Sequence, residues 1–210
     1  MNKVILLKHA LVSNSLTVLR NKNTSIEAFR KHASLVSKIL FLEATKNLNL
    51  SAQAIETPIT KFSGEKLSQK VIVIPVLRAG LAMLFALEDI LPTVSVGFIG
   101  LERDEKTAVA REYYRKFPKI GKTDKIIILD PMLATGGSMD DVLSALLEKD
   151  IKKATLISIV SAPEGIDRIK KRYKNIEIYT AAIDEGLNSK KYIVPGLGDF
   201  GDRYFGTDAI

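Results

Sequence analysis

Cysteine is absent from the 210-residue chain. The protein therefore has no disulfide framework, no thiolate nucleophile and no zinc site built on thiolates. Histidine is scarce as well, because His9 and His32 are the only two, which is too few and too isolated for a histidine-rich metal site. No apolar run approaches membrane-spanning length, and the first nine residues lack the core and cleavage site of a signal peptide. These absences predict a cytoplasmic protein with no membrane association.

Internal repeats and low-complexity segments are also missing, and the composition is that of an ordinary globular protein. A chain of 210 residues can build one sizeable core but is too short for two independent domains, so we expect a single domain over residues 1–210. The net charge of +7 suits either nucleic acid or a polyanionic small molecule. Because lysines and arginines are spread along the chain, charge alone does not decide between these partners.

Apolar runs with the character of buried parallel strands occur at residues 71–76, 94–99, 125–130, 154–160 and 176–183. Segments with helical spacing follow the first, third and fourth runs, at residues 80–90, 137–149 and 165–173. Strands that alternate with helices predict an α/β fold with an open, mostly parallel five-stranded sheet flanked by helices. In such a sheet, ligands bind at the carboxyl ends of the strands.

Two further segments stand out beside this alternating pattern. Residues 24–27 resemble a capping box and are followed by apolar residues at helical spacing up to Leu40, which predicts a helix that packs on the core or on a partner subunit. Residues 102–119 are rich in charge and have no clear apolar period. A long polar connection of this kind is often a mobile lid, so we expect a flexible arm.

The most informative segment is residues 126–139, where a buried strand runs into Asp130 and then into a turn of small residues that opens a helix. Successive N–H groups from Ala134 to Ser138, together with the positive end of the helix dipole, can bind an anion. Two adjacent glycines remove the Cβ atoms that would keep a phosphate from the main chain. Asp130 can accept hydrogen bonds from sugar hydroxyls on the same ligand. The segment therefore predicts a site for a sugar phosphate, whereas a bare Thr-Gly-Gly-Ser would equally suit an ordinary turn.

Two arginines follow the first two predicted strands and would share the sheet edge with this phosphate cradle. Arg78 lies where the first strand turns into its helix, and Arg103 lies at the end of the second strand. A planar guanidinium suits bidentate binding of phosphate oxygens. Pairing with a surface carboxylate is the alternative for Arg78 alone, but two arginines at one edge favour a shared anion.

The chain ends in a second glycine-rich segment, residues 192–207, in which residues 196–201 match the pattern G-x-G-x-x-G. A dinucleotide fingerprint needs a strand before this pattern and a helix after it within a βαβ unit, and only nine residues follow Gly201. We therefore reject that interpretation. The glycines, interspersed with apolar and aromatic residues, indicate an irregular loop that brings backbone close to a flat or crowded partner rather than a free tail.

Together these segments resemble the uracil branch of the type I phosphoribosyltransferase family over nearly the full length of the chain. The resemblance lies in these motifs: Asn23-Thr24-Ser25, Glu43-Ala44-Thr45, Ile55-Glu56-Thr57-Pro58, Leu77-Arg78-Ala79-Gly80-Leu81, Gly100-Leu101 with Arg103-Asp104-Glu105, the phosphate cradle, Ala162-Pro163-Glu164-Gly165 and the terminal Gly-Leu-Gly-Asp run. It implies transfer of a 5-phosphoribosyl group from phosphoribosyl pyrophosphate (PRPP) to N1 of uracil, giving UMP and pyrophosphate with magnesium.

The resemblance also implies roles for particular residues. PRPP would contact Arg78, Arg103, Asp130, Pro131, Met132, Leu133, Ala134, Thr135, Gly136, Gly137, Ser138 and Asp199. Uracil would contact Ile193, Gly198, Asp199 and Phe200. The catalytic residues would be Arg78, Arg103, Asp130 and Asp199, with Asp199 also a candidate for orienting or deprotonating the base. Residues 184–210 would form a hood over the sheet, and the protein would be a homodimer or a larger homo-oligomer.

Some features depart from the usual family pattern, and some alternatives remain. Asp130 is followed by Pro131 rather than by a second acid, so magnesium is expected to bind mainly through PRPP oxygens and waters. Phe98, Glu102 and Phe200 stand where many relatives have other residues.

An RNA-binding regulator on the same scaffold and an enzyme for another base, such as a purine, are the rival interpretations. No motif indicates whether GTP or another nucleotide regulates the protein.

Overall fold

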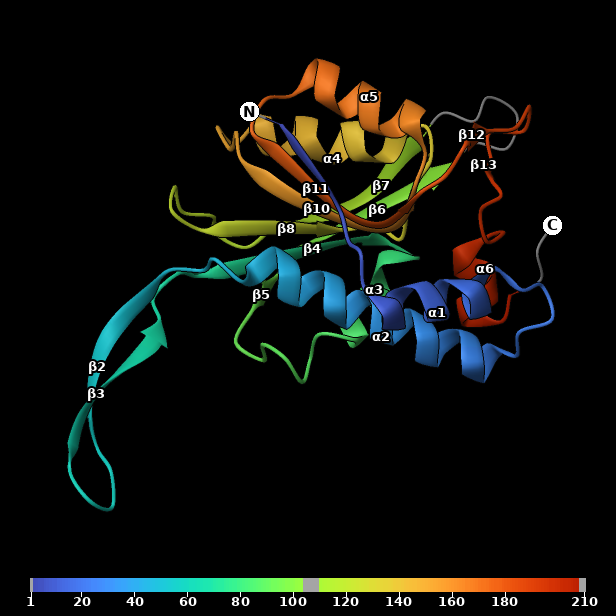
Figure 1. Cartoon of the computed structure of the whole chain (residues 1–210). Coiled ribbons are helices and arrows are strands. Elements are labelled where there is room, and N and C mark those ends of the chain that lie inside the picture. The colour runs from blue at the N-terminus through green and yellow to red at the C-terminus, as the bar shows by residue number, and fades with distance from the viewer. Residues whose placement is uncertain (1, 104–109, 208–210) are drawn as a thin grey trace.

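A computed structural model describes residues 2–103 and 110–207 and has the predicted α/β architecture (Figure 1). The central sheet has the strand order β1-β11-β10-β8-β4-β6-β7, and all neighbouring pairs along it are parallel except β6 and β7. Its strands are β1 (Lys3–Leu6), β4 (Val71–Leu77), β6 (Phe98–Arg103), β7 (Ala110–Lys116), β8 (Lys125–Leu129), β10 (Ala154–Ser161) and β11 (Ile176–Ile183). Two short strands, β5 (Ser95–Val96) and β9 (Met132–Leu133), pair with β4 and β10.

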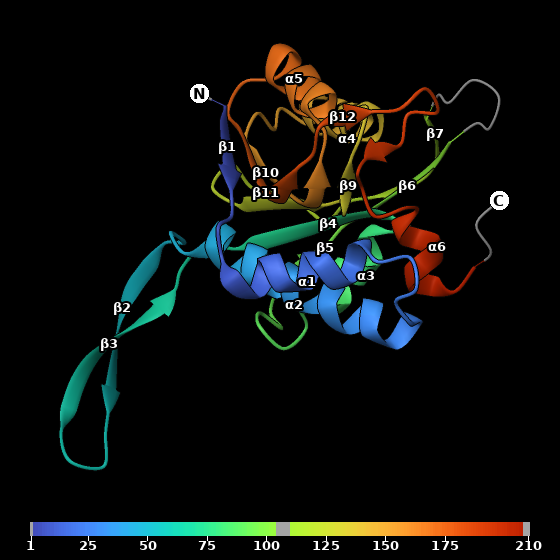
Figure 2. The same cartoon turned by 45° about the vertical axis from the view of Figure 1, so that its right-hand side comes forward.

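Helices cover both faces of the sheet (Figures 1 and 2). One face carries α4 (Gly137–Leu147) and α5 (Pro163–Arg172). The other carries α1 (Ala10–Arg20), α2 (Ile26–Thr45) and α3 (Gly80–Phe85), with the short α6 (Phe200–Phe205) beside them. In the described part of the chain no helix is long and apolar enough to cross a membrane.

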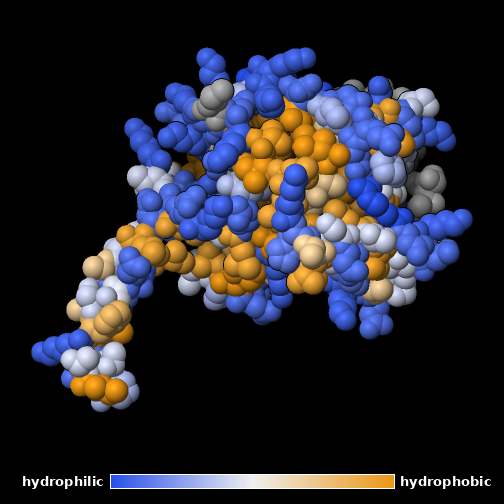
Figure 3. All heavy atoms as spheres, in the orientation of Figure 1, coloured by the Kyte–Doolittle hydropathy of each residue, from blue (hydrophilic) through white to orange (hydrophobic). Residues whose placement is uncertain are grey.

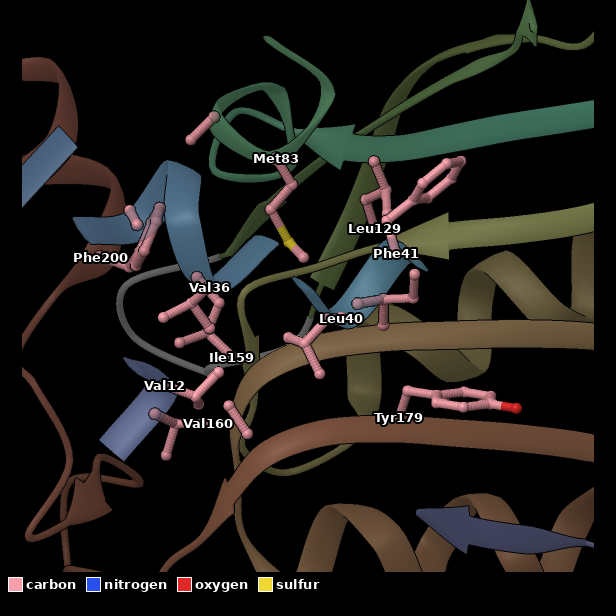
Figure 4. Packing of buried hydrophobic residues seen from close by; sticks show 14 of the residues in the cluster. Val12, Val36, Leu40, Phe41, Met83, Leu129, Ile159, Val160, Tyr179 and Phe200 are labelled. Carbon is pink, nitrogen blue, oxygen red and sulfur yellow. The ribbon is translucent and has the colours of Figure 1, made fainter. Parts of the chain in front are cut away.

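The core is divided between the two faces because successive side chains of a strand point to opposite sides. In β4, Val71 and Val73 pack toward α2, whereas Ile72, Ile74 and Val76 pack toward α4. All five are buried, and the same alternation runs through β8 and β10. This double burial explains why these strands read as continuous apolar runs. Figure 4 shows the cluster on the α2 side, where labelled residues include Val36, Leu40, Phe41, Met83, Leu129 and Ile159.

The structure adds strands that the apolar runs did not predict. The expected run at 94–99 is divided at Gly97 into β5 and β6, and the Gly97 N–H donates to the Val73 carbonyl at 2.9 Å. Residues 110–116, part of the predicted arm, form β7, whose side chains are exposed from Arg111 to Lys116 and therefore carry no burial pattern. The ring of Tyr113 lies directly over Gly100, where an added Cβ would be 2.5 Å away. Residues 104–109 of the arm lie outside the described residues.

Two other local features also differ from the expectation. Strands β2 (Leu50–Glu56) and β3 (Lys61–Leu67) form an antiparallel hairpin that projects far from the body of the molecule. The helix that begins near residue 26 is capped by Ser25, whose Oγ accepts from the Ala28 N–H at 3.3 Å, instead of by Thr24. The Thr24 hydroxyl instead donates to the Val18 carbonyl in the last turn of α1, at 2.6 Å.

Candidate active site

The phosphate cradle lies at the carboxyl end of β8, as predicted. After Asp130 the chain forms β9, turns through Gly136 at φ 74°, and enters α4 at Gly137. A Cβ on Gly136 would lie 3.0 Å from the Gly165 carbonyl oxygen, so both the left-handed backbone and the close approach of α5 require glycine. Gly136 is also the N-cap and has no side chain, which leaves the first turn of α4 open to an anion. Thr135 supports this turn, because its Oγ1 accepts from the Gly137 N–H at 3.3 Å.

Asp130 is the half-buried acid at the entrance of the cradle. Its Oδ1 accepts a hydrogen bond of 3.3 Å from the Met132 N–H, and its carbonyl accepts one of 2.7 Å from the Ser158 hydroxyl. Burial raises the pKa of Asp130 from 3.8 to about 6, and the bond from Met132 only partly offsets this rise. The side chain is therefore ionised at neutral pH and can accept hydrogen bonds from hydroxyl groups.

The C-terminal loop begins after β12 (Gly186–Leu187) and β13 (Ile193–Val194), which pair in antiparallel fashion. The Val194–Pro195 peptide is cis, and Gly196 and Gly198 have φ values of 59° and 81°. Asp199 then caps α6, because its Oδ1 accepts from the Asp202 N–H at 3.0 Å.

Phe200, the first residue of α6, is 2% exposed and directs its ring into the core. Its ring centroid lies 5.3 Å from that of Phe29 and 5.9 Å from that of Tyr204. The contact with Phe29 holds α6 against α2. The ring of Phe200 is therefore packed in the core and is not free in the cavity described next.

The cradle and the C-terminal loop line one open cavity, although they are about sixty residues apart in the sequence. Figure 2 shows β9, which leads into α4, and the short α6, all of which contribute residues to this lining. The cavity is lined by Ala79, Asp130, Met132, Leu133, Ala134, Thr135, Gly136, Gly137, Ser138, Met139, Lys191, Tyr192, Ile193, Gly198, Asp199, Phe200 and Gly201. The structure thus brings together the two segments that the sequence analysis singled out.

Two of the predicted site residues whose side chains the structure describes, Arg78 and Pro131, are not among those that line this cavity. Arg78 lies just outside it, exposed, with Nη2 3.6 Å from Oδ1 of Asp202, and the Leu77–Arg78 peptide is cis. Pro131 is buried, and its carbonyl accepts from the N–H groups of Ile159 and Val160 at 3.0 Å, so it joins the cradle to β10. Arg103 is the last residue of β6, and its side chain lies outside the described part of the chain.

Some of the lining residues were not predicted. They are Ala79, Met139, Lys191, Tyr192 and Gly201, and each is a direct neighbour, or the neighbour of a neighbour, of a predicted residue. Lys191 has φ 66°, which turns the chain immediately before Tyr192. Tyr192 opens the glycine-rich terminal segment and could have been found from its position there. Across residues 2–103 and 110–207, no cluster of three or more histidine, aspartate and glutamate side chains could hold a metal ion.

The fold is that of the type I phosphoribosyltransferases. A hypoxanthine-guanine phosphoribosyltransferase from Bacillus anthracis is only 13% identical but has the same fold, with a TM-score of 0.51 over 76% of this chain and 80% of that chain. The AQ2163 protein from Aquifex aeolicus is 35% identical and superposes with a TM-score of 0.92 over 99% of this chain and 100% of that chain.

The sequence comparisons identify the branch. Residues 6–207 match the profile of the uracil phosphoribosyltransferase family. A uracil phosphoribosyltransferase from Campylobacter curvus is 47% identical over 207 residues, which cover 99% of this chain and 100% of the relative. One from Malacoplasma penetrans is 47% identical over 199 residues, covering 95% of this chain and 97% of the relative. The chain belongs to the uracil phosphoribosyltransferase family, which confirms the resemblance drawn from its motifs.

Proposed function

We propose that this site transfers the 5-phosphoribosyl group of PRPP to N1 of uracil and releases pyrophosphate, leaving UMP. The observation that carries the proposal is the single cavity lined by both the phosphate cradle and the C-terminal loop. A sugar phosphate held by the first and a flat base held by the second would meet inside it. Membership of the family supports the same reaction.

The cradle and its neighbouring acid have the chemistry to hold the phosphoribosyl part of PRPP. Backbone N–H groups around Gly136 and the start of α4 suit the 5′-phosphate. Asp130, ionised at neutral pH, suits the ribose hydroxyls beside it. The exposed guanidinium of Arg78, which precedes the lining residue Ala79 in the chain, suits the oxygens of the pyrophosphate. The same role for Arg103 rests on the family resemblance.

The reaction separates charge, and this determines what the protein must stabilise. As the bond between C1 and the pyrophosphate breaks, positive charge develops on the ribose and negative charge on the leaving group. A guanidinium fixed near the pyrophosphate therefore stabilises the transition state more than the bound substrate. We assign this role to Arg78, with its 3.6 Å contact to Asp202 restraining the free side chain.

Selectivity for uracil follows from a site built of backbone groups. Because the Phe200 ring is buried against Phe29, the base meets main-chain N–H and C=O groups between residues 198 and 200. Uracil presents an N3–H donor between two carbonyl acceptors, whereas cytosine presents a ring acceptor and an amino donor. A cavity that pairs with uracil leaves buried groups unpaired with cytosine and should reject it strongly.

We propose magnesium as the cofactor, bound mainly through oxygens of PRPP and water. The acids of the cavity support this arrangement, since Asp130 and Asp199 are its only lining carboxylates among the described residues and Asp199 already caps α6. Magnesium sites at phosphates commonly use one or two carboxylates and several waters. When bound, the ion would neutralise part of the charge on the pyrophosphate.

We propose a homo-oligomer because the β2–β3 hairpin projects from the body of the molecule (Figure 1). Its large apolar side chains face solvent, with Ile59 94% and Phe62 57% exposed. Figure 3 shows apolar residues along this hairpin. A two-stranded hairpin is marginally stable alone in water, so a second copy of the chain is expected to cover it. Sedimentation of Ile59→Asp should then show a smaller species than the wild type, and an unchanged size would contradict the role of the hairpin.

The remaining parts of the proposal are a cytoplasmic location and small-molecule substrates without nucleic acid. The test of function is a panel of free bases offered with PRPP and magnesium. UMP formation from uracil, with cytosine, hypoxanthine and guanine slower by at least about a hundredfold, is the expected result. Faster turnover of a purine base would overturn the proposed specificity, and no turnover of any base would overturn the reaction.

A further inference from the structure

Two buried aspartates lie behind the cavity without lining it, one behind each half. Asp184 is 8% exposed and lies behind the C-terminal loop, and Asp140 is 3% exposed and lies behind the phosphate cradle. Arg20 of α1 binds Asp184, and Arg168 and Arg172 of α5 bind Asp140. A buried carboxylate is costly to desolvate, so its retention calls for a specific use.

Asp184 holds the turn in the middle of the C-terminal loop. Arg20, the last residue of α1, donates to both of its carboxylate oxygens, at 2.8 and 2.6 Å. The Gly196 N–H donates to Oδ2 of Asp184 at 2.8 Å, and the Gly196 carbonyl accepts from Nη1 of Arg20 at 2.7 Å. The peptide groups on both sides of Gly196 are therefore tied to one ion pair.

This turn has little freedom of its own. A Cβ on Gly196 would lie 2.1 Å from the carbonyl oxygen of Ile193, so the backbone folds tightly back on itself. Ile193 and Gly198, on either side of the turn, both line the cavity. The Asp184 N–H donates to the Ser161 carbonyl at 2.9 Å, which anchors the ion pair to the end of β10. The clamp thus sets where the base-binding part of the loop lies relative to the sheet.

Asp140 performs the corresponding task for the cradle. It lies in the first turn of α4 and accepts hydrogen bonds from Nη2 of Arg168 at 2.7 Å, from Arg172 and from the hydroxyl of Tyr173. Arg168 passes directly behind the cradle, because its Cδ lies 3.4 Å from the position of a Cβ on Gly136. Burial raises the pKa of Asp140, but the hydrogen bonds from Tyr173 and Arg168 outweigh it and keep the pKa below its usual value.

We propose that Asp184 and Asp140 are positioning residues that fix the two halves of the site separately, Asp184 the base-binding loop and Asp140 the phosphate cradle. This inference rests on the proposed function. Each ion pair restrains a turn that contributes to the cavity, and among the described residues the hydrogen bonds of the two clamps share no side chain. Loosening one clamp should therefore weaken the use of one substrate and spare the other.

The test compares Asp184→Asn and Asp140→Asn in steady-state assays of UMP formation, each with the other as its control. Asp184→Asn should raise KM for uracil about tenfold and leave KM for PRPP within twofold, and Asp140→Asn should do the reverse, since displacements of about 1 Å have effects of this size or larger. Asp150→Asn is the matched surface control and should change neither KM, because Asp150 is exposed and forms an ion pair with the exposed Lys152. KM does not depend on the fraction of folded enzyme, so a merely structural role would lower activity without this split.

Two milder variants keep the inference testable if either aspartate variant fails to fold. Arg20→Lys and Arg168→Lys keep the positive charge but lose the planar fork, and each should reproduce the KM change of its partner aspartate more weakly. Equal changes in both KM values, or no change in either, while the wild type forms UMP, would overturn this inference and leave the proposed function intact. No UMP formation by the wild type would overturn the proposed function and this inference with it.

Discussion

Replacement of Asp130 by asparagine should make the protein more stable and the enzyme less active. The carboxylate is half-buried, and burial raises its pKa from 3.8 to about 6. In the unfolded chain it ionises near its ordinary pKa, so above pH 6 the folded state bears the cost of a charge that it solvates poorly. A pKa difference of about 2 corresponds to about 3 kcal/mol, which water reaching the half-buried group reduces to about 2 to 3 kcal/mol.

The difference between the pKa of Asp130 in the folded and the unfolded protein determines how its contribution to stability changes with pH. The favourable contribution of protonated Asp130 is complete below pH 3.8 and is lost as pH rises through about 6. Asparagine has no charge, and its Oδ1 can still accept the Met132 N–H. Asp130→Asn should therefore be more stable than the wild type by about 2 to 3 kcal/mol at pH 8 and by about half of that at pH 5.

The assay is urea unfolding of both proteins at the two pH values, combined with kinetics. Loss of charged hydrogen bonds to ribose hydroxyls should lower kcat/KM for PRPP by about ten- to a hundredfold. In the wild type, kcat/KM for PRPP should fall as pH drops below about 6, beyond the decrease caused by protonation of the substrate phosphate. A variant that is less stable than the wild type by the same amount at both pH values, with unchanged use of PRPP, would refute the reasoning.

Three other substitutions test separate parts of the site. Arg78→Ala should lower kcat/KM for PRPP by about a hundredfold without weakening the binding of uracil, and a defect confined to uracil would contradict the assignment of its guanidinium to pyrophosphate. Gly136→Ala should lower the free energy of unfolding by about 1 to 3 kcal/mol in a urea titration and raise KM for PRPP, because of the φ of 74° and the 3.0 Å approach to Gly165; unchanged values would show that the turn tolerates a side chain. Phe200→Ala should cost about 3 to 5 kcal/mol of stability in the same titration and leave the ratio of uracil to cytosine turnover unchanged, and a changed ratio would show that the ring itself reads the base.

The parts of the fold that could be predicted from sequence are those buried on both faces. Strands β4, β8, β10 and β11 read as continuous apolar runs because helices cover each side of them. Strand β7 and the β2–β3 hairpin expose nearly all of their side chains and so leave no period of burial in the sequence. Their pairing depends on the neighbouring strand, which local patterns do not reveal.

The site, like the fold, has parts that could be predicted from the sequence and parts that could not. The cradle could be found because the strand, the acid, the glycines and the helix are contiguous, and backbone geometry alone explains their use. That the cradle and the C-terminal loop form one site could be predicted only from the resemblance to a family. The clamp between Arg20 and Asp184 joins residues 164 positions apart that carry no local signature, and only the folded chain reveals it.

The central claim is that the cradle holds the phosphate of a nucleotide while the C-terminal loop holds its base. A crystal structure of the protein with UMP and pyrophosphate tests this most directly. We predict the 5′-phosphate against the N–H groups of residues 135–138 and the uracil ring against the backbone of residues 198–200. UMP bound with its phosphate away from that turn, or with its base out of reach of the loop, would contradict the account.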